Sequence, residues 1–344
     1  MPLDTSPRDD PEHDPGTDVA GRRAAALSER PPAPLRIPHR AAGGIIVGTA
    51  SWTDPTMTAA GVFYPDDVHT PEERLRYYAS RFPVVEIDSP YYALPTRRNA
   101  ELWLERTPTD FTFDVKAHAL MTGQPSEPNR LPKALRDALP GELATRRTVY
   151  ARELRPEIVD AVWSTFRDAL EPLHAAGKLG AVLLQYPRWF LPSPESRDRM
   201  IEARHRLEGF PIAVELRNRR WYAPRVLPRL LEVLRGEGIP LVSVDAPQGH
   251  ESSVPDVVET TSPHLAVVRL HGRRSDTWQK RGVPVVERFR YLYDREQLES
   301  WVPRIVEIAE RTRWTHVVFN NCYGNYGTTN AREMTELLAR ALDR

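Results

Sequence analysis

The sequence has little cysteine, no excess of charge of either sign and no long apolar run, and each absence excludes a class of protein. Cys322 is the single cysteine among 344 residues, so an internal disulfide framework is excluded and a reducing compartment is expected. The 47 basic and 47 acidic residues balance, so nothing draws the whole chain to nucleic acid or to an anionic membrane. No apolar run reaches the roughly 18 residues that a membrane helix needs.

The amino-terminal region also lacks the features that would target it or fold it. Met1 to Asp10 contain no basic segment followed by an apolar one, so no signal peptide is predicted. Residues 1–42 are rich in proline and charge and have no apolar periodicity, which predicts a disordered tail before one domain over 43–344. The resulting expectation is a cytoplasmic protein with a small-molecule substrate, without membrane or nucleic-acid partners. The oligomeric state stays open.

What the sequence does contain is a repeated alternation of short strands with helices. Strands are predicted at 45–52, 84–89, 111–116, 181–185, 211–216, 241–245, 266–271 and 316–321. Eight such units over about 300 residues are typical of a (β/α)8 TIM barrel, an α/β fold. The competing fold, a doubly wound open sheet, needs a glycine-rich dinucleotide turn after the first strand, and Gly48 to Trp52 do not supply one.

Capping signals and one long insertion complete the expected outline. A polar residue followed three positions later by Glu or Gln marks a helix start. Thr70 and Asp294 begin such capping boxes, and Asn330 is predicted to cap the final helix. Residues 121–156 form a proline- and arginine-rich insertion after the third strand, too long for an ordinary connection. This insertion is predicted to be a lid or a floppy excursion.

Strand parity predicts that charged side chains point into the barrel. Side chains alternate along a strand, and we take the apolar face of each strand to pack against the helices. The opposite face, near the carboxyl ends of the strands, then carries Glu86, Asp88, Asp114, Lys116, Gln185, Glu215, Arg217, Asp245, Arg269, His271 and Asn320. Barrel enzymes keep their chemistry at this end, so the set predicts a functional site. An internal ion-pair network is the alternative.

Three chemistries stay open for these residues. The first is a divalent metal, Mg²⁺ or Mn²⁺ in preference to Zn²⁺. Its ligands would be Glu86 or Asp88, with Glu215, Asp245 and His271. The second is metal-free acid–base catalysis by two carboxylates, in which Arg217 keeps Glu215 ionised. The third is binding without catalysis.

The loops that follow the strands add aromatic rings and glycines. Flat rings beside carboxylates suit stacking on sugars or bases. The rings expected at this rim are Trp52, Tyr91, Tyr92, Trp189, Trp221 and Tyr222. A phosphate site is also expected between the loops after the seventh and eighth strands. There Gly272, Gly324 and Gly327 would offer backbone amides, and Arg269 or Arg273 a charge.

Motifs at all eight strand ends resemble the YecE-like family, the domain of unknown function 72. The resemblance covers about 44–341 and rests on Gly48-Thr49-Ala50-Ser51-Trp52, Val85 to Pro95, Phe113-Asp114-Val115-Lys116, Gln185-Tyr186-Pro187, Glu215-Leu216-Arg217 with Trp221, Val244 to Pro247, Arg269 to Arg273 and Phe319-Asn320-Asn321. It implies a TIM barrel but supplies no activity, because the family is only loosely described as related to sugar isomerases. Asp88 stands where the family usually has Asn, and Met121 to Gly123 where it tends to have Thr-His.

Together these observations predict an enzyme that acts on a small sugar-like or phosphorylated substrate by isomerase-type or hydrolase-type acid–base chemistry. The expected catalytic residues are Glu215, Glu86, Asp245, Lys116 and His271. The expected substrate-binding residues are Arg217, Arg269, Asp88, Gln185, Asn320, Asn321, Trp52, Tyr92, Trp221 and Arg273. No cofactor is required, and a divalent metal is an option. The alternatives are a metal-dependent phosphodiesterase or nuclease-like barrel, and a ligand-binding barrel without turnover.

Overall fold

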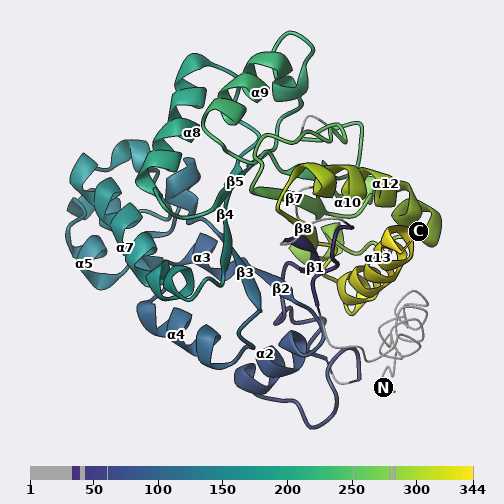
Figure 1. The fold of residues 1–344 in the computed structure, drawn as a ribbon. Helices are drawn as coiled ribbons and strands as arrows, with labels where there is room; N and C mark the ends of the chain where they lie inside the picture. The colour runs from purple at the N-terminus through teal and green to yellow at the C-terminus, as the bar shows by residue number, and fades with distance from the viewer. Residues whose placement is uncertain are drawn as a thin grey trace, which may run out of the picture.

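Eight parallel strands form one sheet in the order β5-β4-β3-β2-β1-β8-β7-β6 (Figure 1). The structure, a computed structural model, describes residues 33–38, 43–59, 61–250, 252–278, 280, 282 and 284–343. The strands are β1 (Gly44–Thr49), β2 (Val84–Ile87), β3 (Thr112–Lys116), β4 (Leu179–Tyr186), β5 (Ile212–Leu216), β6 (Ser243–Asp245), β7 (Leu265–Leu270) and β8 (Trp314–Phe319).

The two outermost strands of this sheet also meet, which closes it into a barrel. The amide of Val214 in β5 donates to the carbonyl of Pro240 at 2.8 Å, and the amide of Val242 donates to the carbonyl of Val214 at 2.9 Å. Leu241 pairs with Val214 as a single parallel bridge. By contrast, a continuous ladder of six residue pairs joins β7 to β8. The TIM barrel predicted from the sequence is confirmed.

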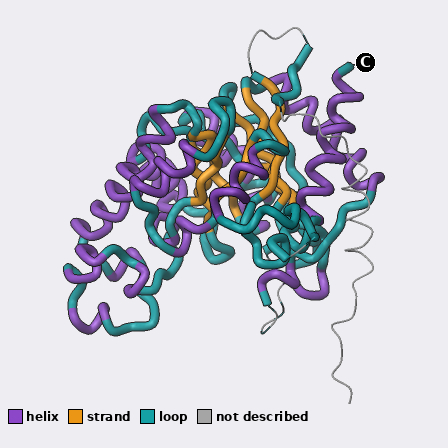
Figure 2. The backbone as a smooth tube through the Cα atoms, turned by 90° about the horizontal axis from the view of Figure 1, so that it is seen from below, coloured by secondary structure: helices purple, strands orange, loops and turns teal. Residues whose placement is uncertain are grey.

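Helices surround the strands (Figures 1 and 2). They are α2 (Pro71–Ala79), α3 (Ser89–Tyr92), α4 (Arg97–Glu105), α5 (Lys133–Asp137), α6 (Gly141–Ala144), α7 (Pro156–Ala175), α8 (Pro194–Arg206), α9 (Leu227–Gly236), α10 (Ser275–Trp278), α11 (Val285–Arg288), α12 (Arg295–Arg311) and α13 (Tyr326–Leu342). The crossover from β6 to β7 contains no helix among its described residues, 246–250 and 252–264. None of the described helices is long and apolar enough to cross a membrane.

Two of the predicted helix starts are confirmed and one is wrong. Thr70 and Asp294 each form a complete capping box at the start of α2 and α12. Asn330 does not cap the last helix, because α13 already begins at Tyr326. The side chain of Asn330 is buried inside the helix, where it bonds to both the amide and the carbonyl of Tyr293 at 3.0 and 2.9 Å. A tertiary contact therefore uses the amide group that the sequence pattern assigned to a cap.

Two segments that the sequence left outside the folded core are packed into it. Of the predicted tail, 1–32 and 39–42 lie outside the described residues. Residues 33–38 are described, and there Leu35 pairs with Ile45 in an antiparallel bridge while Ile37 is buried. The insertion is not a floppy excursion. It contains the short 3₁₀ turns η1 (Ala119–Thr122), η2 (Pro128–Arg130) and η3 (Ala151–Glu153) as well as α5 and α6.

Buried leucines hold the insertion beside α7, at the left of Figure 1. Leu131, Leu135, Leu139 and Leu143 belong to the main hydrophobic cluster. An antiparallel bridge between Ser126 and Val149 ties the two ends of the segment together. Because apolar side chains recur through the proline-rich stretch, the segment can bury enough surface to offset its ordering entropy.

The closeness of β1 to β2 leads to a test of the fold. A Cβ atom on Gly48 would lie 2.0 Å from the carbonyl oxygen of Val84, so any side chain there forces two barrel strands apart. We expect Gly48→Ala to lower the free energy of unfolding by roughly 3 kcal/mol or more, the upper range for overpacking, because the clash is with backbone. Chemical denaturation measures this loss.

Gly236→Ala is the matched control. A Cβ at Gly236 in α9 would meet nothing within 4 Å, so the same substitution should be neutral or stabilise by about 0.5–1 kcal/mol. Equal stabilities of the two variants would show that β1 and β2 are not held this closely.

Candidate functional site

A buried guanidinium joins three strands across the inside of the barrel. Arg269 of β7 donates through Nη2 to Oε1 of Glu86 in β2 and through Nη1 to Oε2 of Glu215 in β5. All three side chains are at most 1% exposed. We call these three residues the Arg269 cluster. Their side chains point into the barrel, as strand parity predicted from the sequence.

Glu215 is the most heavily bonded member of the cluster. Its Oε1 accepts from Nη1 of Arg217 at 2.8 Å and from Nε2 of Gln185 at 3.0 Å. Burial alone would raise the pKa of Glu215, but the charges of Arg269 and Arg217 outweigh it and hold the pKa well below its usual range. Glu215 is therefore a fixed carboxylate.

Glu86 has the opposite electrostatics. Burial raises its pKa from 4.5 to about 8, since Arg269 offsets only part of the desolvation and Asp88 adds a like charge. Arg269 itself stays charged, because the two glutamates outweigh its burial and raise its pKa. One guanidinium thus separates a carboxyl group that holds its proton near neutral pH from one that does not.

His271 is a neutral imidazole. Burial lowers its pKa to about 4. Its Nε2 lies 2.9 Å from Nη1 of Arg217. Because a guanidinium can only donate, Nε2 is the acceptor, and the 3.3 Å approach to Glu215 is then a contact without a proton. The proton of the neutral ring is then on Nδ1, which lies 2.8 Å from the amide nitrogen Nδ2 of Asn320. Because that nitrogen can only donate, the carboxamide must be turned so that its oxygen accepts from Nδ1.

A second, more exposed pair lies two residues further along β2 and β3. Nζ of Lys116 is 3.4 Å from Oδ1 of Asp88, and their side chains are 13% and 36% exposed. Nζ also lies 4.7 Å from the ring centre of Tyr91. The hydroxyl of Tyr91 donates to Gln124 at 3.0 Å, and Gln124 donates in turn to the carbonyl of Gln185 at 3.0 Å. The pair is thus supported from β2, β3 and β4.

Several polar atoms at this end of the barrel are buried without a hydrogen-bond partner among the described residues, and two of them belong to side chains that make no other polar contact. They are the indole N–H of Trp52 and the hydroxyl of Tyr222. Burial and the charge of Glu215 raise the pKa of Tyr222, so its hydroxyl keeps its proton. A buried polar group without a partner costs about 1–3 kcal/mol. These groups are therefore candidates for contact with a ligand.

Sequence reasoning missed several residues that the structure brings to the site. The sequence predicts Tyr222 only as a rim aromatic, and no pattern in it indicates Gln124 or Trp278. The guanidinium carbon of Arg217 lies over the ring of Trp278, 5.1 Å from the ring centre. The aromatic motif around Tyr91 was a usable signal. Gln124 and Trp278 come from loops whose paths parity does not predict.

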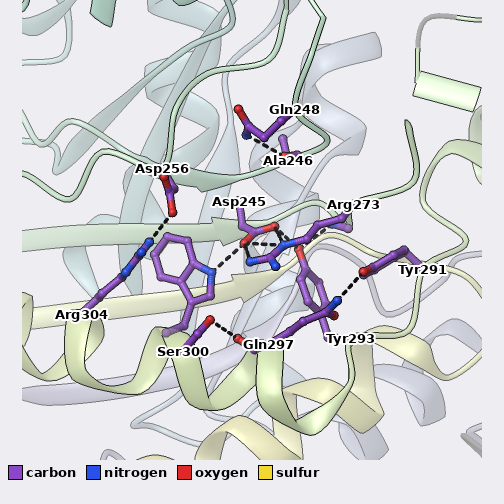
Figure 3. Close-up of polar contacts among 12 residues, drawn as sticks. Asp245, Ala246, Gln248, Asp256, Arg273, Tyr291, Tyr293, Gln297, Ser300 and Arg304 are labelled. Carbon is purple, nitrogen blue, oxygen red and sulfur yellow. Dashed lines mark hydrogen bonds and ion pairs between the residues drawn. The ribbon is translucent and has the colours of Figure 1, made fainter. Parts of the chain in front are cut away.

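The inward placement predicted for Asp245 is wrong. Val244 pairs in register with inward-facing Arg269, so the next residue, Asp245, faces the helices. There its carboxylate accepts from Arg273 at 2.6 to 3.1 Å, from the hydroxyl of Tyr293 at 2.9 Å and from Nε1 of Trp301 at 2.7 Å (Figure 3). The apolar-outside assumption fails here because these donors satisfy a carboxylate between the sheet and α12.

The same contacts remove most of the expected phosphate site. Arg273 is bound to Asp245, and the amide of Gly272 donates to Tyr293 at 2.8 Å. The amide of Gly324 donates to Thr56 at 2.8 Å. The guanidinium and the two backbone amides that were predicted to bind an anion are thus bonded within the protein.

Three further predicted binding residues do not share one setting. Asn321 is buried and donates to the carbonyl of Tyr291 and to Asn330. Trp221 is fully buried, and its Nε1 donates to the carbonyl of Phe190 at 2.7 Å. The donor groups of both are therefore bonded within the protein, whereas Oδ1 of Asn321 is buried without a partner among the described residues. Tyr92, in contrast, is 54% exposed and packs edge-on against Tyr91.

The predicted metal ligands are not brought together. Asp245 lies outside the barrel, and Glu86 and Glu215 are both bonded to Arg269. Across the described ranges, no three His, Cys, Asp or Glu side chains are grouped so that they could hold a metal ion. A guanidinium occupies the position between the two carboxylates that the metal hypothesis required.

The closed barrel with a charged carboxyl-terminal end defines a TIM-barrel protein, and comparisons define its family. The profile of the protein of unknown function DUF72 matches residues 46–344. The UPF0759 protein YunF of Bacillus subtilis (strain 168) is 31% identical over 301 residues, which cover 86% of this chain and 94% of that relative. The chain therefore belongs to the DUF72 family, and the resemblance seen in the sequence is confirmed.

Solved structures of the family have the same fold. A DUF72 family protein from Enterococcus faecalis V583 is 26% identical and superposes with a TM-score of 0.68, covering 86% of this chain and 95% of the other. One from Thermotoga maritima MSB8 is 28% identical with a TM-score of 0.67, covering 86% and 98%.

The opposed pKa shifts of the two glutamates predict opposite pH effects on stability. Between about pH 4.5 and 8 the unfolded chain releases a proton that folded Glu86 keeps, so this group lowers stability as pH rises, by up to about 1.4 kcal/mol per pH unit. Glu86→Gln should remove that slope. Denaturant unfolding across this pH range measures it.

Glu215→Gln is the matched comparison with the opposite sign. A lowered pKa stabilises the fold above the pKa of the unfolded chain and is lost as pH falls. Glu215→Gln should thus cost most near neutral pH and progressively less in acid. Slopes that change in the same direction in both variants would contradict the assignment.

Proposed function

We propose that this chain is an enzyme that moves a proton between neighbouring carbons of a small, neutral, sugar-like carbonyl compound. The observation that carries the proposal is the partly exposed Lys116–Asp88 pair, which lies next to the buried Arg269 cluster at the carboxyl end of the barrel. Barrels of this fold present their reacting groups at that end.

Lys116 is the cation best able to bind a substrate. Arg269 and Arg217 are bonded to Glu215 and its neighbours. Lys116 has one carboxylate contact, at 3.4 Å, and an ammonium has three donors. At least one donor can therefore reach a substrate oxygen while Asp88 stays close by.

The charge balance favours a substrate that becomes negative only during the reaction. Lys116, Arg217 and Arg269 face Glu86, Asp88 and Glu215. With Glu86 protonated, as its raised pKa indicates, the set carries one positive charge near neutral pH. Preorganised positive charge stabilises a developing oxyanion. This supports proton abstraction beside a carbonyl better than glycoside hydrolysis, whose transition state is cation-like.

Each group then has a role in a balanced proton transfer. The ammonium of Lys116 donates a hydrogen bond to the carbonyl oxygen. The carboxylate of Asp88 takes the proton from the adjacent carbon, and the C–H electron pair forms the double bond of an enediolate. Return of the proton by Asp88 to the former carbonyl carbon, with passage of the hydroxyl proton from the second oxygen to the first, gives the isomer. Protonation of the original carbon on its other face by a water molecule gives the epimer, and Asp88 then releases its proton to solvent. No electron leaves the substrate.

The surroundings support a sugar-like compound over a phosphorylated one. Trp52 and Tyr222 hold a buried N–H and a buried hydroxyl without partners in the described chain, which suits hydroxyl groups of a ligand. Tyr92 and Trp189 are 54% and 53% exposed, and flat rings stack on sugar faces. The groups expected to bind phosphate are already bonded, so that substrate has less support.

Solvent exchange tests this proposal directly. The protein is incubated in D₂O with a panel of pentoses and hexoses, both aldoses and ketoses, and proton NMR follows the carbon next to the carbonyl. At least one sugar should lose that proton signal and yield an isomer or epimer. Lys116→Met should reduce the rate by about 100-fold or more, since it removes the oxyanion donor.

Lys178→Met is the matched control. Lys178 is a buried lysine that lies just before β4, at the opposite end of the barrel, where it bonds to Thr107 at 3.0 Å. Its variant should keep the rate. Absence of exchange with every sugar, or equal rates for the two lysine variants, would refute the proposal.

A further inference from the structure

A cavity lies outside the barrel, between β4, α7, α8 and the insertion. Its volume is 230 Å³, and its walls include Met121, Tyr150, Trp163, Tyr186, Phe190 and Arg199. Tyr186 belongs to the helix-facing side of β4, and Gln185, the residue before it, points inward to Glu215. The cavity is therefore separated from the Lys116–Asp88 pair by the thickness of one strand.

Rings form most of one wall. Tyr186 stacks on Phe190 with centroids 4.2 Å apart and planes at 19°. Trp163 and Met121 are both buried and contribute apolar surface to the same space. Such a wall suits a flat apolar ligand, because ring pairs prefer offset stacking or edge contacts at these distances.

Tyr186 lines this cavity, and its buried hydroxyl has no hydrogen-bond partner among the described residues. The side chain is 2% exposed, and its oxygen makes no hydrogen bond in the described part of the protein. Burial raises its pKa; of the two charges that border the cavity, Glu202 raises this pKa further and Arg199 lowers it. A buried hydroxyl without an acceptor is costly, and a ligand oxygen in the cavity would satisfy it.

Arg199 supplies an uncommitted positive charge at the rim. No ion pair or hydrogen bond of Arg199 occurs with any described residue, whereas Arg206 on the same helix binds both Glu202 and Asp160. Its guanidinium reaches toward the insertion, since Nη1 lies 4.0 Å from where a Cβ on Gly123 would stand. The cation therefore spans the cavity from α8 toward η1.

We infer that this cavity binds a small organic anion with a single flat ring, such as an aromatic carboxylate. The ring would lie against Tyr186, Phe190 and Trp163. One anionic oxygen would pair with Arg199, and an oxygen would accept from the hydroxyl of Tyr186. The volume is below the roughly 300 Å³ at which drug-sized ligand pockets begin, which excludes a nucleotide. This site is independent of the chemistry proposed at the barrel end.

Calorimetric titration of the full chain with benzoate, and with neutral benzamide as the isostere, tests the inference. Benzoate should bind, and benzamide should bind about 10-fold more weakly or worse, because a hydrogen bond to a charged group is worth about 1.5–3 kcal/mol. Arg199→Met should weaken benzoate by the same factor. Tyr186→Phe, which removes one oxygen, should weaken it about 3- to 10-fold.

Two control variants locate the anion. Arg197 lies on α8 but outside the cavity wall. The variant Arg197→Met should therefore keep the affinity for benzoate. Lys116→Met should also keep it, because Lys116 lies at the barrel end. No binding of benzoate up to roughly 10 mM, an affinity well short of the usual range for a specific site, would overturn the inference. Equal effects of Arg199→Met and Arg197→Met, or a loss in Lys116→Met, would do so as well.

Discussion

The burial of Arg269 is the constraint on which the rest of the barrel depends. Moving a guanidinium out of water costs several kcal/mol unless charge and hydrogen bonds offset it. The carboxylate of Glu215 supplies the charge, and the carboxyl group of Glu86 accepts a further hydrogen bond from another strand. Their unequal surroundings follow from this sharing: Glu215 has further partners in Arg217 and Gln185, and Glu86 has none of these. The buried Arg269 cluster, which lies beneath the more exposed Lys116–Asp88 pair, therefore decides which of the two glutamates keeps its proton.

Much of the fold and part of the site could be predicted because both follow from alternation. The strand pattern places apolar residues on one face, so Glu86, Glu215 and Arg269 had to point inward once the barrel was recognised. The rule failed at Asp245, whose strand is only three residues long. A strand of three residues has too few apolar side chains to show which face is inside. The carboxylate of Asp245 accepts hydrogen bonds from Trp301, Tyr293 and Arg273 between the sheet and α12.

The remaining features could not be predicted because they depend on side-chain and loop placement. Whether the hydroxyls of Tyr222 and Tyr186 find acceptors is decided by rotamers and by neighbours far away in the chain. The packing of the insertion could not be predicted for a related reason. Its leucines are spaced among prolines without helical periodicity, yet several short turns bring them to one surface against α7. Local pattern predicts elements, whereas these contacts arise only when elements meet.

The weak closure between β5 and β6 gives the buried charges a mechanical importance. Among the described residues, backbone bonding there is limited to the contacts of Val214 with residues 240–242. Glu215 lies on one side of this seam, on β5, and Arg269 lies beyond it on β7. Their ion pair therefore fastens the barrel where its hydrogen-bonded wall is thinnest. A ligand or proton that draws Glu215 away from Arg269 would widen the cylinder at this seam first, so the charge state of the centre and the circumference of the barrel are coupled.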